Sequence, residues 1–184
     1  MKNKVRCQWA ENEIFHSYHD SEWGKPVHDD KIHFEFLILE AAQAGLTWAT
    51  ILKRREGYKK AFANFNANKV ATFTQKDVEK LMLNEEIVRN RSKIESAISN
   101  AKLFLEVQKE FGSFDKYVWK FVGDKPLVNM WNGMSQVPAT SNESEALSKD
   151  LKKRGFRFVG PTIMYAYMQA VGLINDHQVN CFAR

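Results

Sequence analysis

The segment LKKRGFRFVGPTIMYAYMQAVG, residues 151–172, predicts two helices joined by a short turn. The first helix fills SNESEALSKDLKKRG, 141–155, which has a polar start, acidic residues in its first turn, basic residues in its last turn and a terminal glycine. Pro161 suits the first position of the second helix, and Gly172 suits its end. Such a turn can direct main-chain N–H groups at a phosphate, or it can be an ordinary corner between helices.

Helical patterns also fill most of the chain before this segment. Asp29 and Asp30 precede a run with apolar residues at helical spacing, and Thr74 can cap another helix. The residues 44–46 form a tight corner between two predicted helices. Further helices are predicted over 31–44, 46–65, 75–82, 87–111 and 114–122, and a loop over 123–142. The sequence therefore predicts an all-α single domain over 1–184, with a hairpin motif at about 148–172.

Composition limits the class of protein. The 184 residues are 44% hydrophobic and 27% charged, a balance suited to one folded core and unlike that of a disordered chain. No apolar run is long enough for a membrane span, and the first residues lack the apolar core of a signal peptide. We therefore expect a soluble, cytoplasmic monomer. The formal charge of +5 permits a polyanionic partner, and basic residues concentrate in 53–60, 89–93 and 152–157.

The only two cysteines lie near opposite ends of the chain, and each has a histidine companion. His177 and Cys181 are four residues apart, so a helix there would put both side chains on one face. Cys7 and His19 are far enough apart for the chain to loop back between them. The four residues are a possible closed zinc site, structural because it has no open position, or two reduced cysteines with two ordinary histidines.

One acidic residue lies inside an apolar stretch. Glu40 follows FEFLIL and precedes AAQAG, an unfavourable place for an acid that faces water. Glu40 is therefore either a surface residue, as most glutamates are, or a buried acid that needs a partner. A cationic ring between aromatic side chains would be such a partner. The side chains expected around Glu40 are Trp9, Tyr18, Trp23, Gln43 and Trp48.

Several long motifs, in this order, resemble those of the DNA-3-methyladenine glycosylase I family, within the helix-hairpin-helix superfamily. They span nearly the whole chain and read RCQWA, YHDSEWG, LEAAQAGLTW, LKRREGY, LSKDLKKRGFRFVG and MQAVGLINDH. The hairpin departs from the commoner pattern, because Phe158 stands where a first glycine is usual. The resemblance implies an enzyme that hydrolyses the N-glycosidic bond of N3-methyladenine in double-stranded DNA. Its products would be free 3-methyladenine and an abasic site.

The resemblance also implies roles for individual residues. Glu40 matches the catalytic residue of a base pocket formed by Tyr18 and Trp48, with Trp9 and Trp23. The residues matching the ligands of a structural Zn²⁺ are Cys7, His19, His177 and Cys181. The implied DNA contacts are Gly45 and Leu46 as a wedge in the gap left by the flipped nucleotide, and Lys153, Arg154, Val159 and Gly160 in the hairpin.

Two further positions bear on the reaction. Asp176 is a candidate to orient water or to stabilise the sugar, as an aspartate after the hairpin does in other members of the superfamily. Pro161 and Thr162 stand where strand-cleaving relatives carry a nucleophilic lysine, so we expect base removal alone. The alternatives are a DNA-binding module without catalysis, and a hydrolase of another substrate whose zinc site has an open position.

Overall fold

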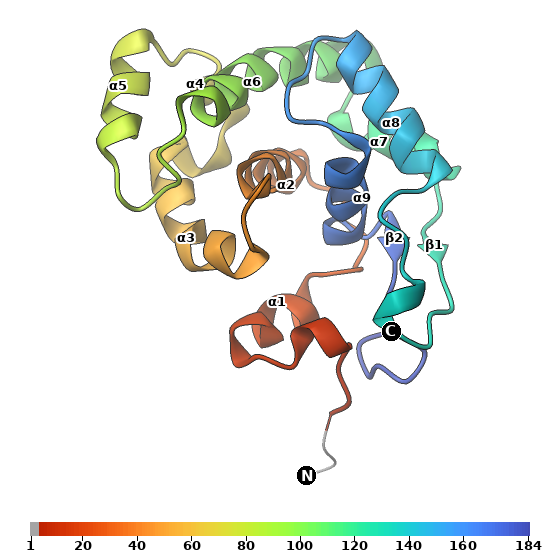
Figure 1. The fold of residues 1–184 in the computed structure, drawn as a ribbon. Coiled ribbons are helices and arrows are strands. Elements are labelled where there is room, and N and C mark those ends of the chain that lie inside the picture. Colours follow the sequence, from red (N-terminus) through yellow and green to blue (C-terminus); the bar gives the residue numbers. More distant parts are fainter. Residues whose placement is uncertain (1–3) are drawn as a thin grey trace.

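The computed structural model describes residues 4–184, and helices that surround a central helix make up most of it (Figure 1). Their bounds are α1 (His16–Ser21), α2 (Asp30–Gln43), α3 (Trp48–Ala61), α4 (Ala67–Val70), α5 (Gln75–Leu83), α6 (Arg91–Phe111), α7 (Phe114–Trp119), α8 (Asn142–Lys153) and α9 (Pro161–Ala170). One continuous core joins them, which confirms the expected single, predominantly helical domain. None of the helices described has the length and apolarity that crossing a membrane requires.

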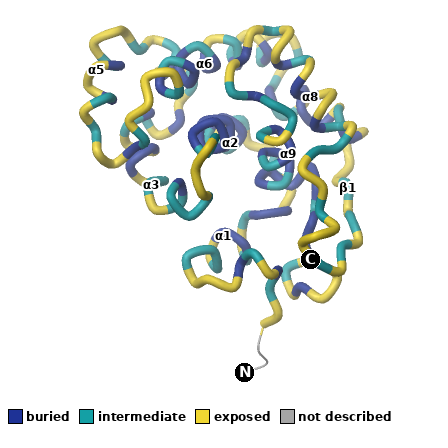
Figure 2. The backbone as a smooth tube through the Cα atoms, in the orientation of Figure 1, coloured by how far each residue is buried: buried dark blue, intermediate teal, exposed yellow. Residues whose placement is uncertain are grey.

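Helix α2 lies at the centre because its C-terminal half, apart from Glu40, is apolar on every side. Residues 36–42 are all buried, and Figure 2 shows this helix as the darkest part of the tube. It packs against α3, α6, α7 and α9. The Asp29 side chain accepts a hydrogen bond from the Lys31 N–H at 2.7 Å and so fixes the start of the helix. A helix buried on all sides has no solvent-facing stripe, so Glu40 is carried into the interior.

The two helices of the predicted hairpin, α8 and α9, pack closely against each other. The turn between them is held from both sides: the Ser148 hydroxyl donates to the Val159 carbonyl at 2.6 Å, and the Asn100 amide pairs with the main chain of Arg157. Phe158 has φ +55, the left-handed conformation that a glycine adopts most easily. The departure from the usual motif therefore changes the residue and keeps a left-handed conformation in the turn.

Four secondary-structure predictions were wrong. The helix predicted over 46–65 is α3, which ends at Ala61 because residues 63–65 have positive φ. Helix α6 starts at residue 91 instead of 87, because the Asn90 side chain accepts the Lys93 N–H and caps the helix there. The predicted loop 123–142 contains β1 (Leu127–Val128), which pairs in parallel with β2 (Ile174–Asn175). The helix expected around His177 is absent from the described chain, because residues 176–184 form turns after β2.

The N-terminal segment crosses α9 at close range. The Gly24 N–H donates to the Gln169 carbonyl at 2.9 Å, and the Val27 N–H donates to the Val171 carbonyl at 3.1 Å. Gly172 makes this crossing possible: it has φ +68, and a Cβ there would lie 2.1 Å from the carbonyl carbon of Lys25. The contact brings α1 and the residues before it against the C-terminal half of the chain, where the candidate site forms.

Candidate active site and metal centre

A cavity of about 350 Å³ contains the predicted aromatic and acidic side chains. Tyr18 enters from α1, Glu40 from α2, and Trp48 from the first position of α3. Trp9 and Trp23 complete the wall on the side of the N-terminal segment. The structure therefore brings together all five residues predicted for the base pocket.

The aromatic rings of this cavity pack against one another. The centroids of Tyr18 and Trp48 are 5.2 Å apart, and those of Trp9 and Trp23 are 4.9 Å apart with an interplanar angle of 72°. The indole N–H groups of Trp9 and Trp48 are buried and have no hydrogen-bond partner among the described residues. Aromatic faces arranged in this way can hold a flat, electron-poor ring by stacking and by cation–π attraction.

Glu40 is the one acidic residue that lines this cavity. Glu40 is only 4% exposed, and none of the residues described donates a hydrogen bond to its carboxyl group. Burial raises the pKa of Glu40 to about 8. A buried carboxyl without donors favours its neutral form, and an entering cation or N–H donor shifts it toward the carboxylate. The site therefore favours the binding of a ligand that carries positive charge or amino groups.

Sequence reasoning did not identify the third wall of the cavity. Helix α9 contributes Thr162, Tyr165, Ala166 and Gln169, which are spaced so that they share one helix face. The same spacing in the sequence could have identified these four residues as one face of a helix. Met134 and residues 137–139 also line the cavity, from a 3-10 turn and the extended chain after it, whose local sequence carries no such periodic signal.

Asp176 lies behind the α9 wall and is fully paired. One carboxylate oxygen accepts hydrogen bonds from the Asn129 amide and the Trp131 indole N–H, both at 2.7 Å. The other accepts from the Tyr165 hydroxyl at 2.6 Å and from the Gln169 amide at 2.7 Å. Four donors satisfy this 1% exposed carboxylate, so Asp176 supports the wall and is not placed to activate water.

The predicted wedge lies beside the cavity. Gly45 and Leu46 line a second cavity of about 360 Å³, which also includes Glu40, Gln43 and Thr162 from the first. Leu46 is 41% exposed, and Gly45 has φ +76 with open space around it. An apolar side chain therefore projects at the end of α2, next to the aromatic pocket.

The predicted hairpin contacts are of different kinds. Val159 is buried, so only its main chain can meet a ligand, and the position of a Cβ on Gly160 faces open space. Lys153 is exposed. Arg154 is already paired, because its guanidinium donates to Glu110 at 2.6 Å and to Asp150 at 2.7 Å.

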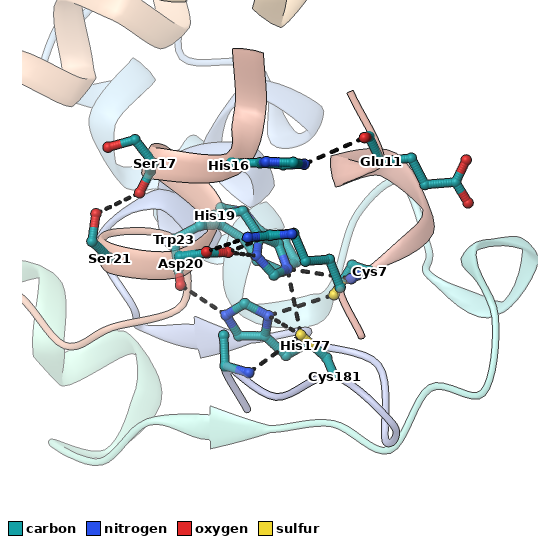
Figure 3. A network of polar contacts seen from close by, with 12 residues as sticks. Cys7, Glu11, His16, Ser17, His19, Asp20, Ser21, Trp23, His177 and Cys181 are labelled. Atoms are coloured by element: carbon teal, nitrogen blue, oxygen red, sulfur yellow. Dashed lines mark hydrogen bonds and ion pairs between the residues drawn. The ribbon is translucent and has the colours of Figure 1, made fainter. Parts of the chain in front are cut away.

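The two termini meet at a buried cluster of two cysteines and two histidines (Figure 3). One potential ligand atom from each lies within 4.8 Å of the others. Cys181 Sγ is 3.4 Å from His19 Nε2 and from His177 Nδ1, and Cys7 Sγ is 3.5 Å from His177 Nδ1. Zinc bonds of about 2.0 Å to nitrogen and 2.3 Å to sulfur place tetrahedral ligand atoms about 3.3–3.8 Å apart. The three distances between these atoms therefore match the spacing of a four-coordinate metal site, which the cluster could form.

The surroundings of the cluster also suit a metal. The second ring nitrogen of His19 bonds to Asp20 at 2.9 Å, and that of His177 bonds to the Trp23 carbonyl at 3.0 Å. These acceptors hold the N–H on the outer nitrogen and leave the lone pair of the inner nitrogen facing the cluster. Burial raises the pKa of the Cys7 thiol to about 12, so a thiolate there needs a cation beside it.

The comparisons with known proteins agree with this site. The family model for methyladenine glycosylase matches residues 9–184. The chain is 46% identical to DNA-3-methyladenine glycosylase 1 of Escherichia coli (strain K12), over 96% of this chain and 95% of that protein. A crystal structure of a 3-methyladenine DNA glycosylase I is 44% identical, with TM-score 0.94, over 97% of this chain and 98% of that one. A structure that addresses 3-methyladenine recognition by the Staphylococcus aureus enzyme is 36% identical, with TM-score 0.93, over 97% and 95% of the two chains. The chain belongs to the methyladenine glycosylase family.

Proposed function

We propose that the protein is a DNA glycosylase that removes N3-methyladenine from double-stranded DNA. The observation that carries this proposal is the buried Glu40 carboxyl group, which has no donor among the described residues and lies in a cavity walled by aromatic rings. Methylation at N3 gives the purine a positive charge, and its amino group supplies N–H donors. Such a base complements Glu40 better than neutral adenine does.

The reaction needs little acid catalysis. The N9–C1′ bond breaks, its electron pair neutralises the methylated base, and positive charge moves to the sugar. Water then adds to C1′ and loses a proton, which leaves an abasic site. Tyr18 and Trp48 stack on the extruded base while Glu40 accepts hydrogen bonds from its amino edge. A damaged base that stacks poorly costs less to extrude than an intact one, which adds selectivity.

The DNA is held by the corner after α2 and by the hairpin. Leu46, beside Gly45, fills the gap left by the extruded nucleotide. The main-chain N–H groups of Val159 and Gly160, which donate to none of the described residues, bind a backbone phosphate. Lys153 adds positive charge, and Arg154 offsets the negative charge of the Glu110 and Asp150 carboxylates with which it pairs, which would otherwise repel the phosphates.

The metal is zinc in a structural role. Cys7, His19, His177 and Cys181 would hold the ion with four protein ligands, which would leave no open position for a reacting water. When bound, the ion neutralises the buried thiolates and ties residues 7–19 to the segment after β2. The wall residues Trp9 and Trp23 pack against His19 and His177, so the pocket gains rigidity from the same cluster. The protein works as a cytoplasmic monomer.

Product analysis tests this function against that of a DNA-binding module without catalysis. Metal-loaded protein is incubated with methylated duplex DNA, and both the supernatant and the strands are analysed. We expect free 3-methyladenine and intact strands that break only on alkali treatment, because Pro161 and Thr162 offer no nucleophilic lysine. Tight DNA binding without any base release would instead favour the non-catalytic module.

A further inference from the structure

The corner between α2 and α3 is held by a lysine from a distant helix. Lys93, in the first turn of α6, donates from Nζ to the Ala42 carbonyl at 2.9 Å and to the Ala44 carbonyl at 2.6 Å. Both carbonyls belong to the C-terminal end of α2, where helical partners run out. The Leu46 N–H donates to the Gln43 carbonyl at 2.6 Å and closes the corner from the other side.

Lys93 is itself fixed in place. The Asn90 side chain accepts its main-chain N–H at 3.1 Å, so the residue sits in the capped first turn of α6. Its ammonium group lies at the negative end of the α2 dipole, a favourable position for a cation. The side chain is partly buried, which lowers the pKa of Lys93. Two carbonyl acceptors, a capped backbone and partial burial give the ammonium group one preferred position.

We propose that Lys93 is a positioning residue for base extrusion, because it holds the corner that presents Leu46 to the DNA. This inference rests on the proposed glycosylase function. Leu46 is 41% exposed, so packing contributes little to fixing its direction, and Gly45 at φ +76 adds conformational freedom. A corner fixed before binding loses less conformational entropy when it enters the duplex. The same corner also lines the cavity beside Glu40, so the wedge lies next to the place where the extruded base would be held.

The test separates base extrusion from base binding. Single-turnover release of 3-methyladenine is measured on methylated duplex DNA and on the same strand without its complement. Binding of free 3-methyladenine is followed by tryptophan fluorescence. The variants are Lys93→Met, which removes both hydrogen bonds, and Lys93→Arg, which keeps a cation and donors. Lys102→Met is the matched control, because it removes a charge from an exposed position of the same helix.

We expect Lys93→Met to slow release from duplex DNA about tenfold, the effect of losing hydrogen bonds from a charged group. Release from single strands and binding of the free base should change less than about twofold, because neither needs the wedge. Lys93→Arg should recover most of the duplex rate, and Lys102→Met should match the parent. Equal losses on duplex and single strands, or no loss, would overturn the role of Lys93 and leave the glycosylase function standing. A parent protein that releases no base from either DNA would overturn both.

Discussion

Replacing Glu40 by glutamine should make the protein more stable and less active. In the free protein this carboxyl group is buried, and no described residue donates a hydrogen bond to it. Glutamine keeps its shape and removes the charge. The gain in stability and the loss of excision have the same origin, because the unpaired acid is unfavourable until a cationic base enters the pocket.

The pKa of Glu40 gives the size of the effect. It rises from an ordinary 4.5 to about 8 in the folded protein, and each pH unit between the two values corresponds to about 1.4 kcal/mol. Because the folded pKa is the higher one, this carboxyl group does not reduce stability below pH 4.5, and its cost grows as the pH rises toward 8. The Glu40→Gln variant should therefore gain less than about 1 kcal/mol at pH 5, about 3 kcal/mol at pH 7 and at most about 5 kcal/mol at pH 9.

Denaturant unfolding at pH 5, 7 and 9 measures this difference, since all other titrating groups are common to both proteins. Excision by the variant should fall about 30-fold, equivalent to about 2 kcal/mol for a lost charged hydrogen bond. Glu35→Gln is a control on the same helix with the opposite sign: Glu35 pairs with Arg55 at 2.7 Å, so losing it should destabilise. A stability difference that does not change with pH, or an unchanged excision rate, would refute the assigned role of Glu40.

Four further substitutions test the rest of the molecule. Cys181→Ser should lower metal content and reduce the free energy of unfolding by about 4 kcal/mol, and a metal-free variant as stable as the parent in calorimetry would show that the cluster is incidental. Lys153→Met should weaken binding to all DNA sequences and reduce the slope of log K against log salt by about 1; a slope equal to that of the parent would remove Lys153 from the phosphate contacts. Arg154→Met should weaken binding too, and should also lower thermal stability because Arg154 bridges Glu110 and Asp150. Gly172→Ala should cost about 3 kcal/mol, since a Cβ there meets the Lys25 main chain; unfolding at the parent's denaturant concentration would contradict the tight crossing.

The sequence predicted those elements whose signals are local. Helix α2 and the pair α8 and α9 carry their own caps, glycines and apolar spacing, and they lie where these signals put them. The position of Glu40 inside an apolar run favoured a buried acid over a surface residue, and the structure has Glu40 buried in the half of α2 where residues 36–42 have no exposed side.

Features that depend on distant partners were beyond local reasoning. The strands β1 and β2 have two residues each, too few to show alternation, and they exist through pairing with each other. His177 and Cys181 converge through turns instead of a helix, as the His177 N–H bonds to the Asn175 side chain. The paired state of Asp176 likewise follows from donors on two separate segments.

The most direct test of the account is the selectivity of base release. Purified, metal-loaded protein is incubated with methylated duplex DNA, and 3-methyladenine and 7-methylguanine are separated chromatographically over time. Capture by Glu40 in its aromatic pocket predicts release of 3-methyladenine with little 7-methylguanine, because both methylated bases are cationic but guanine has a carbonyl oxygen, which cannot donate to a carboxylate, where adenine has its amino group. Equal release of the two bases would contradict recognition by Glu40, and release of neither would contradict the glycosylase itself.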